Sequence, residues 1–155
     1  MFGSVKKVQS RKIAWALVIV AAMLALLATT VYAAESARFK MALTGAEEVP
    51  VQGDPDGVGK ARVTLDRDLS QVCFEIRVAK ITLPATSAHI HSGVAGVSGP
   101  AVVTLTPPDA SGMSSGCVAA DLTLITEIRN NPSGYYVNVH NSDFPAGAVR
   151  GQLSR

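Results

Sequence analysis

Aromatic residues, charges and cysteines are all scarce in this 155-residue chain. Phe, Trp and Tyr together make up 5% of it, so a core has to be built mainly from Val, Ile, Leu and Ala. Charged residues make up 17% and hydrophobic residues 48%, proportions that exclude a disordered polar chain, a collagen and a coiled coil. The length suits one domain, or two at most.

Beyond its N-terminus, the sequence also has no run of basic residues. Residues 1–33 contain four Lys and Arg side chains and no acid, whereas the other 122 residues contain 10 basic and 12 acidic side chains. This larger part therefore has a net charge of −2 and no basic stripe along its sequence. Because nucleic-acid binding requires such a stripe, we expect no nucleic-acid partner.

The N-terminus has the order of a secretory signal. A basic segment precedes an apolar run at residues 13–28, and small residues follow. Val31 and Ala33 suit the −3 and −1 positions of a cleavage site after Ala33, with cleavage after Ala34 as the alternative. Residues 1–33 are therefore predicted to be a signal peptide.

The competing interpretation is an uncleaved anchor, because residues 13–34 are long enough to span a bilayer. In either case the basic flank stays inside and the rest of the chain lies outside the cytoplasm. We expect a secreted or extracytoplasmic protein, at the cell surface or in the periplasm. It would contact the membrane only through the N-terminal segment, if that segment remains uncleaved.

The two cysteines, Cys73 and Cys117, both lie in the predicted exported part. An even pair in an oxidising compartment predicts a disulfide. Such a bridge would close a loop of about 45 residues and contribute at most about 4 kcal/mol in the chain-entropy view. Two buried free thiols are the alternative.

Residues 36–155 read as one all-β domain with short strands between Gly and Pro. The segment 71–80 alternates most cleanly between apolar and polar residues, as a half-buried strand does. We expect further strands at 38–44, 60–66, 87–91, 100–106, 135–140 and 148–153, one short helix within 119–130, and a loop at 47–59 too polar to pack. This pattern predicts a two-sheet, Greek-key-like sandwich or a flattened barrel.

The three histidines are the candidate site. His89 and His91 stand at i and i+2, and His140 ends a strand in which apolar residues also alternate. Side chains at i and i+2 share a strand face, so all three imidazoles are expected on the solvated face opposite the core. Imidazole suits copper and zinc, and three protein ligands leave a position open. Asn138 and Asp143 are candidates to support His140. The competing interpretation is ordinary surface histidines.

Four segments resemble the CHRD family, domains named for chordin and also found alone in exported microbial proteins. They are FKMALTGAEEVP, AHIHSGVAGVSGP, GCVAADL and YYVNVHNSDFPAGAVRGQL, in that order along the chain. The resemblance implies an extracellular β-sandwich domain and says little about activity. It favours a non-enzymatic binding module with an extracellular or cell-surface partner, and we assign no catalytic residue.

A second resemblance is to the copper site of copper-zinc superoxide dismutases. It rests on His89-Ile90-His91, Val139-His140 and Arg150-Gly151, which occur in the same order. It implies copper ligands at the three histidines and an anion-guiding role for Arg150. The chain has no fourth histidine, so the zinc half of such a site is absent. The alternative function is therefore a copper-binding redox protein, with zinc as the alternative metal.

Overall fold

The computed structural model describes residues 36–154, and the predicted signal segment at 1–33 lies outside these described residues. Residues from Ser36 onward form one compact unit. No helix in the described part is long and apolar enough to cross a bilayer. The strands are β1 (Ala37–Thr44), β2 (Val58–Asp66), β3 (Gln71–Ala79), β4 (Ser87–Ser92), β5 (Ala101–Leu105), β6 (Met113–Ala119), β7 (Tyr135–His140) and β8 (Val149–Gln152). The helices are α2 (Leu122–Asn130) and the 3-10 turns η1 (Gly45–Glu47) and η2 (Pro132–Gly134).

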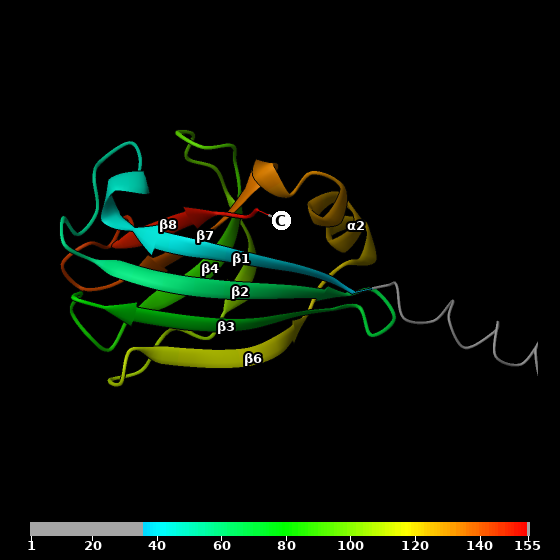
Figure 1. The fold of residues 1–155 in the computed structure, drawn as a ribbon, viewed down its shortest axis with the longest axis horizontal. Helices are drawn as coiled ribbons and strands as arrows, with labels where there is room; N and C mark the ends of the chain where they lie inside the picture. Colours follow the sequence, from blue (N-terminus) through cyan, green and yellow to red (C-terminus); the bar gives the residue numbers. More distant parts are fainter. Residues whose placement is uncertain (1–35, 155) are drawn as a thin grey trace, which may run out of the picture. The chain divides into compact units, whose positions relative to one another are not determined.

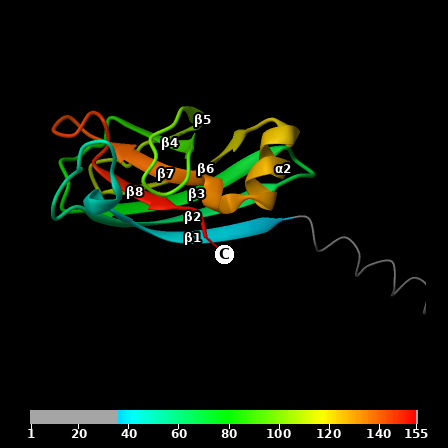
Figure 2. The same cartoon turned by 90° about the horizontal axis from the view of Figure 1, so that it is seen from above.

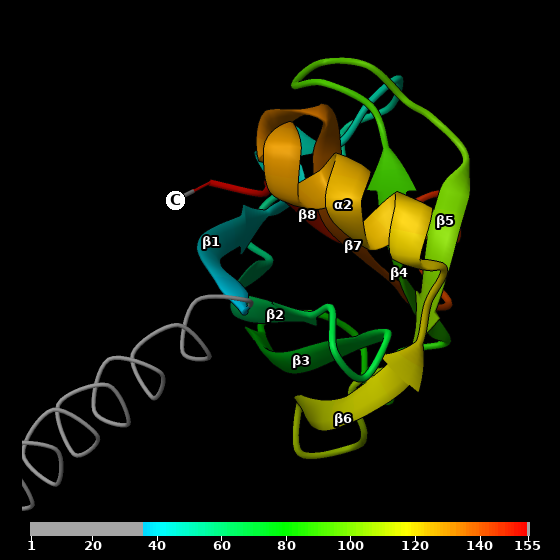
Figure 3. The same ribbon diagram turned by 90° about the vertical axis from the view of Figure 1, so that its right-hand side faces the viewer.

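All eight strands belong to one antiparallel sheet with the order β5-β4-β7-β8-β1-β2-β3-β6. The sheet rolls into a nearly closed, flattened barrel, which confirms the all-β prediction (Figure 1). Figure 3 looks along it: β1, β2, β3 and β6 form one wall, while β8, β7, β4 and β5 form the other. Figure 2 shows α2 at one end and the loop after β1 at the opposite end.

The core fills the space between the walls, and strand alternation selects its residues. In β3 the side chains of Val72, Phe74, Ile76 and Val78 are buried, while Glu75 and Arg77 point outward and are exposed. This is the period of two that the sequence predicted. The helix α2 adds two fully buried isoleucines at the barrel end, and its first turn is capped by the Asp121 carboxylate, which accepts from two backbone amides.

One strand, β6, was not predicted. Its sequence, MSSGCVA, has no apolar alternation, and only β3 pairs with it along this edge of the sheet. Cys73 and Cys117 stand directly opposite each other in that pairing and form the predicted disulfide, so β6 is attached to β3 covalently as well as by hydrogen bonds.

Reduction of this bridge is expected to destabilise the domain by up to about 4 kcal/mol, because the denatured chain regains the freedom of the closed loop. Urea unfolding with and without a thiol reductant measures the difference. An unchanged midpoint after complete reduction would contradict the structural role of the bridge. A Cys73→Ala/Cys117→Ala variant, insensitive to reductant, is the control.

The expectation that the loop at 47–59 is too polar to pack is wrong. Glu48 and Asp54 in it are 5% and 8% exposed. Its backbone is held down, because the Asp54 amide donates to the Ala148 carbonyl and the Gly53 amide to the Gly45 carbonyl. At Gly45 an added Cβ would lie 1.9 Å from the Asp54 carbonyl oxygen, so only glycine permits this approach. The loop therefore carries buried polar groups into the fold.

The solvated face expected for β7 is also corrected. All six of its residues are buried, both the apolar ones that face the core and the polar ones on the other side. Hydrogen bonds show what covers the outer side: Asn138 contacts Glu48 of the loop after β1, and the Tyr136 hydroxyl contacts Gly99 of the loop after β4. Alternation predicts which residues share a face, whereas these coverings depend on distant loops.

Candidate metal centre

The three histidines converge on the outer side of the wall formed by β4 and β7. These strands pair antiparallel, with His89 opposite Asn138 and Ser87 opposite His140. The ring centroid of His89 lies 5.4 Å from that of His91 and 5.2 Å from that of His140, and the remaining pair is 6.0 Å apart. One ring nitrogen from each residue lies within 4.8 Å of the others. The predicted clustering is therefore present.

Backbone carbonyls fix the proton positions on two of the rings. Nδ1 of His91 lies 2.9 Å from the Gly99 oxygen, and Nδ1 of His140 lies 3.1 Å from the Pro145 oxygen. A carbonyl only accepts, so both Nδ1 atoms carry hydrogen, and each Nε2 of the neutral ring keeps a lone pair. Nε2 of His91 is buried and has no hydrogen-bond partner within residues 36–154, and Nε2 of His140 lies 3.2 Å from Nδ1 of His89.

The surroundings favour the neutral form of two of the rings, His89 and His140. Burial lowers the pKa of His89, and the nearby charge of His91 lowers it further. Burial also lowers the pKa of His140; His89 and His91 add to this effect, while the hydrogen bond to Pro145 opposes it. Only the neutral imidazole ligates a metal, so these lowered pKa values favour the form of His89 and His140 that can bind one.

The spacing suits a metal only if the rings move closer together. Nitrogens bonded tetrahedrally at about 2.0–2.1 Å stand roughly 3.3 Å apart, close to the 3.2 Å between His89 and His140. The limit of 4.8 Å over the whole set exceeds the roughly 4.2 Å that two such bonds span. The most distant pair of nitrogens must therefore approach by at least about 0.6 Å, and by about 1.5 Å for a tetrahedral site. His89 and His91 are half-buried, whereas His140 is buried.

Hydrogen bonds through Gly99 couple His91 to Tyr136. The Gly99 carbonyl accepts from His91, and its amide donates to the Tyr136 hydroxyl at 3.2 Å. An added Cβ at Gly99 would lie 1.7 Å from the Ser92 oxygen, so the loop approaches this closely only with glycine. The sequence showed this segment only as a Gly-rich loop, and the structure shows that it orients a candidate ligand.

Arg150 lies behind this arrangement rather than in the site. The Tyr136 ring stacks on His91 at 4.9 Å between centroids, and the Arg150 guanidinium lies 3.4 Å from the same ring, from the neighbouring strand β8. Arg150 is 1% exposed and donates to the Val94 carbonyl. A side chain buried to this extent is placed to support the ring stack, not to attract anions from solvent.

The other two supporting candidates do not bond to His140. Asn138 is buried and donates to a carboxylate oxygen of Glu48 at 3.2 Å. Asp143 is exposed, and its carboxylate accepts from the Thr82 hydroxyl. Neither hydrogen bond supports His140, whose Nδ1 is held by Pro145 instead.

Glu48 is the buried group that the sequence did not reveal. Burial raises its pKa to about 7, while the charge of Arg150 and the hydrogen bond from Asn138 act in the opposite direction. One of its carboxylate oxygens has no hydrogen-bond partner among the described residues. Nothing in the local sequence marks it, because a Glu in a polar, Gly-rich loop is usually exposed.

Glu48 predicts a pH dependence of stability. In the folded state the Glu48 carboxyl keeps its proton up to about pH 7, whereas its ordinary pKa is 4.5. The stabilisation that protonated Glu48 provides is complete below its ordinary pKa and is lost as the pH rises through its pKa in the folded state. The free energy of unfolding should fall by roughly 1–3 kcal/mol as a result. Glu48→Gln should remove that loss. The lowered pKa values of His89 and His140 change stability with pH in the other direction, so the difference in urea unfolding between wild type and variant from pH 4.5 to 8 is the measurement. If the free energies of unfolding of wild type and Glu48→Gln changed with pH in the same way, the raised pKa of Glu48 would be contradicted.

Comparison with known proteins adds one finding. The model of the CHRD domain family matches residues 39–153, nearly the whole described part. No curated protein and no solved structure matches the chain. The similarity to the dismutase copper site therefore rests on the sequence pattern, whereas the match to the family model covers most of the sequence. The chain belongs to the CHRD family.

Proposed function

We propose that this protein is an exported, non-enzymatic binding module that holds one copper ion through His89, His91 and His140. The convergence of the three rings carries the proposal. Two of them have their Nδ1 hydrogens bound by carbonyls, so their Nε2 lone pairs are available. The unpartnered, buried Nε2 of His91 is the kind of atom that a bound metal satisfies. On binding, the neutral His89 ring would place its proton on Nε2 and present Nδ1.

Copper is favoured over zinc by the donor set. One nitrogen from each of three histidines forms the cluster, and no carboxylate or thiolate within the described residues belongs to it. For a given nitrogen site, Cu²⁺ binds more tightly than Zn²⁺. Zinc remains the alternative, since it also accepts three imidazoles and one open position.

Metal content tests the proposal. The purified protein is incubated with excess Cu²⁺, dialysed against a weak chelator and analysed for metal. We expect about one equivalent of copper for the wild type and almost none for a variant with all three histidines changed to Gln. A wild type that retains no more copper than the triple variant would overturn the proposal. Parallel incubation with Zn²⁺ decides between the metals.

The alternative function, a copper redox protein, is favoured by one observation. His89 and His91 are only half-buried, which would give a small molecule a route to this side of the cluster. Because Arg150 is buried, it supplies no positive charge at the surface to guide an anion. Consumption of superoxide by the copper-loaded protein, compared with the His91→Gln variant, tests this function. Equal rates for the two would rule it out.

Export is the remaining part of the proposal, and it rests on the N-terminal sequence and the family. N-terminal sequencing of the protein recovered outside the cytoplasm should begin at Ala34 or Glu35 if the segment is cleaved. An intact Met1 in a membrane fraction would indicate the anchor instead. Intact protein in the soluble cytoplasmic fraction would contradict export.

A further inference from the structure

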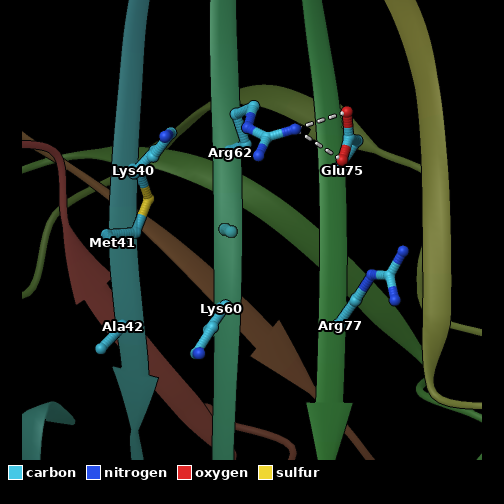
Figure 4. Close-up of a pocket in the computed structure, with 8 residues that line it drawn as sticks. Lys40, Met41, Ala42, Lys60, Arg62, Glu75 and Arg77 are labelled. Carbon is cyan, nitrogen blue, oxygen red and sulfur yellow. Dashed lines mark hydrogen bonds and ion pairs between the residues drawn. The ribbon is translucent and has the colours of Figure 1, made fainter.

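The outer face of β1, β2 and β3 gathers most of the basic residues of the domain. Alternate residues on neighbouring strands point outward together, and the register places Lys40 beside Arg62 and Lys60 beside Arg77. Figure 4 shows these side chains in two rows across the three strands. With Arg38, which is exposed at the start of β1, the face carries five cations. We define these five residues as the basic face.

The charge of this face is opposite to that of the remaining surface. It holds five of the nine Lys and Arg side chains in residues 36–154, but only one of the eleven acidic ones, Glu75. The rest of the described domain therefore has a net charge of −6, while the face has +4. The sequence-based expectation of no basic stripe is corrected, because the cations alternate along three strands and form no run in the sequence.

Most of this charge is not neutralised within the domain. Arg62 forms an ion pair with Glu75 at 3.0 Å, with both side chains about half-exposed. Lys40, Lys60 and Arg77 form no ion pair with any residue of the described part. Lys60 and Arg77 stand opposite each other across neighbouring strands, as do Lys40 and Arg62. Such like charges repel over the strand spacing of about 5 Å, and an external anion relieves that repulsion.

The face is also hollowed. A shallow depression of about 530 Å³ lies between the lysines and arginines, over the short side chain of Ala42. The residues around it include Lys40, Lys60, Arg62 and Arg77 (Figure 4). A flat membrane surface does not enter a depression, whereas a single polymer chain does. Met41 is the large apolar side chain that lines the depression, and it is 7% exposed, which leaves little of it to insert into lipid. The exposed Val58 lies at one end of β2 and Met113 on the edge strand β6.

We propose that the basic face binds a linear anionic polysaccharide outside the cell. The polymer chain would lie in the depression, with its anionic groups against the two rows of cations. This partner suits the extracytoplasmic location of the proposed function and deepens it by naming what the module binds. The face lies on the wall opposite β4 and β7, so this binding is independent of the histidines (Figure 3).

Dextran sulfate is the probe, and uncharged dextran is its control. Affinity is measured with the purified protein as the expression host processes it. Any basic N-terminal residues are then the same in every variant. We expect Lys60→Glu to weaken dextran sulfate binding by roughly tenfold and to lower the slope of log affinity against log salt by about 1–2. The matched control is Lys80→Glu, an exposed lysine beyond the end of β3, which should change the affinity less than about twofold.

Several outcomes would overturn the proposal. One is equal weakening by Lys60→Glu and Lys80→Glu, which would mean that only net charge matters. Another is tighter binding to anionic phospholipid vesicles or to duplex DNA than to dextran sulfate, with the same sensitivity to Lys60→Glu. Copper content is measured on each variant, and it should stay at the wild-type value, so failure of polymer binding is distinguished from failure of the metal site.

Discussion

Replacement of His91 by Gln is expected to weaken copper binding by a factor on the order of 100 or more, with the domain still folded. The change removes the Nε2 lone pair that the Gly99 hydrogen bond leaves available. The Gln side-chain amide still donates a hydrogen bond, so contact with the loop can be retained. His91 is half-buried and lies outside the core, and substitutions at such positions cost little stability, about 0.5–1 kcal/mol.

Calorimetric titration with Cu²⁺ measures this effect, and thermal unfolding of the metal-free variant is the control for folding. His89→Gln and His140→Gln should produce losses of the same order, because each removes one of three ligands. A wild-type affinity in all three variants would show that copper binds elsewhere on the chain.

Replacement of Arg150 by Met is expected to lower the free energy of unfolding by about 3–5 kcal/mol. Arg150 is almost fully buried, donates to the Val94 carbonyl at 3.0 Å and lies 3.4 Å from the Tyr136 ring. Its charge also acts on the buried Glu48 carboxyl. The Met variant has similar length, but it leaves the carbonyl without its donor and the carboxylate without its opposite charge.

Arg62→Met is the matched control. Arg62 is paired with Glu75 on the exposed basic face, where an ion pair is worth less than about 1 kcal/mol. Urea unfolding at pH 8, where Glu48 is ionised, compares the two variants. An Arg150→Met variant no less stable than Arg62→Met would contradict the supporting role of the buried guanidinium.

The features that the sequence predicted correctly are those with a local cause. The alternation in residues 71–80 depends only on the pleat of one strand, and β3 follows it closely. The His89-Ile90-His91 pattern likewise places two imidazoles on one face. That His140 joins them required β4 and β7 to be neighbours, which the structure shows.

The features that the sequence missed depend on contacts between distant segments. The edge strand β6 has no apolar pattern of its own and is defined by its pairing with β3. The burial of Glu48 results from a loop that packs on β7 and β8. The basic face was overlooked because its cations come from three separate strands, two of them contributing two each. No short stretch of the sequence contains all the residues that form any one of these arrangements.

A crystal structure of the copper-loaded protein, with anomalous scattering measured at the copper edge, tests the central claim most directly. The account predicts one copper ion bonded at about 2.0–2.1 Å to Nδ1 of His89 and to Nε2 of both His91 and His140. The Nδ1 atoms of His91 and His140 should keep their hydrogen bonds to Gly99 and Pro145. Copper bound at another place, or held by fewer than three of these nitrogens, would contradict it.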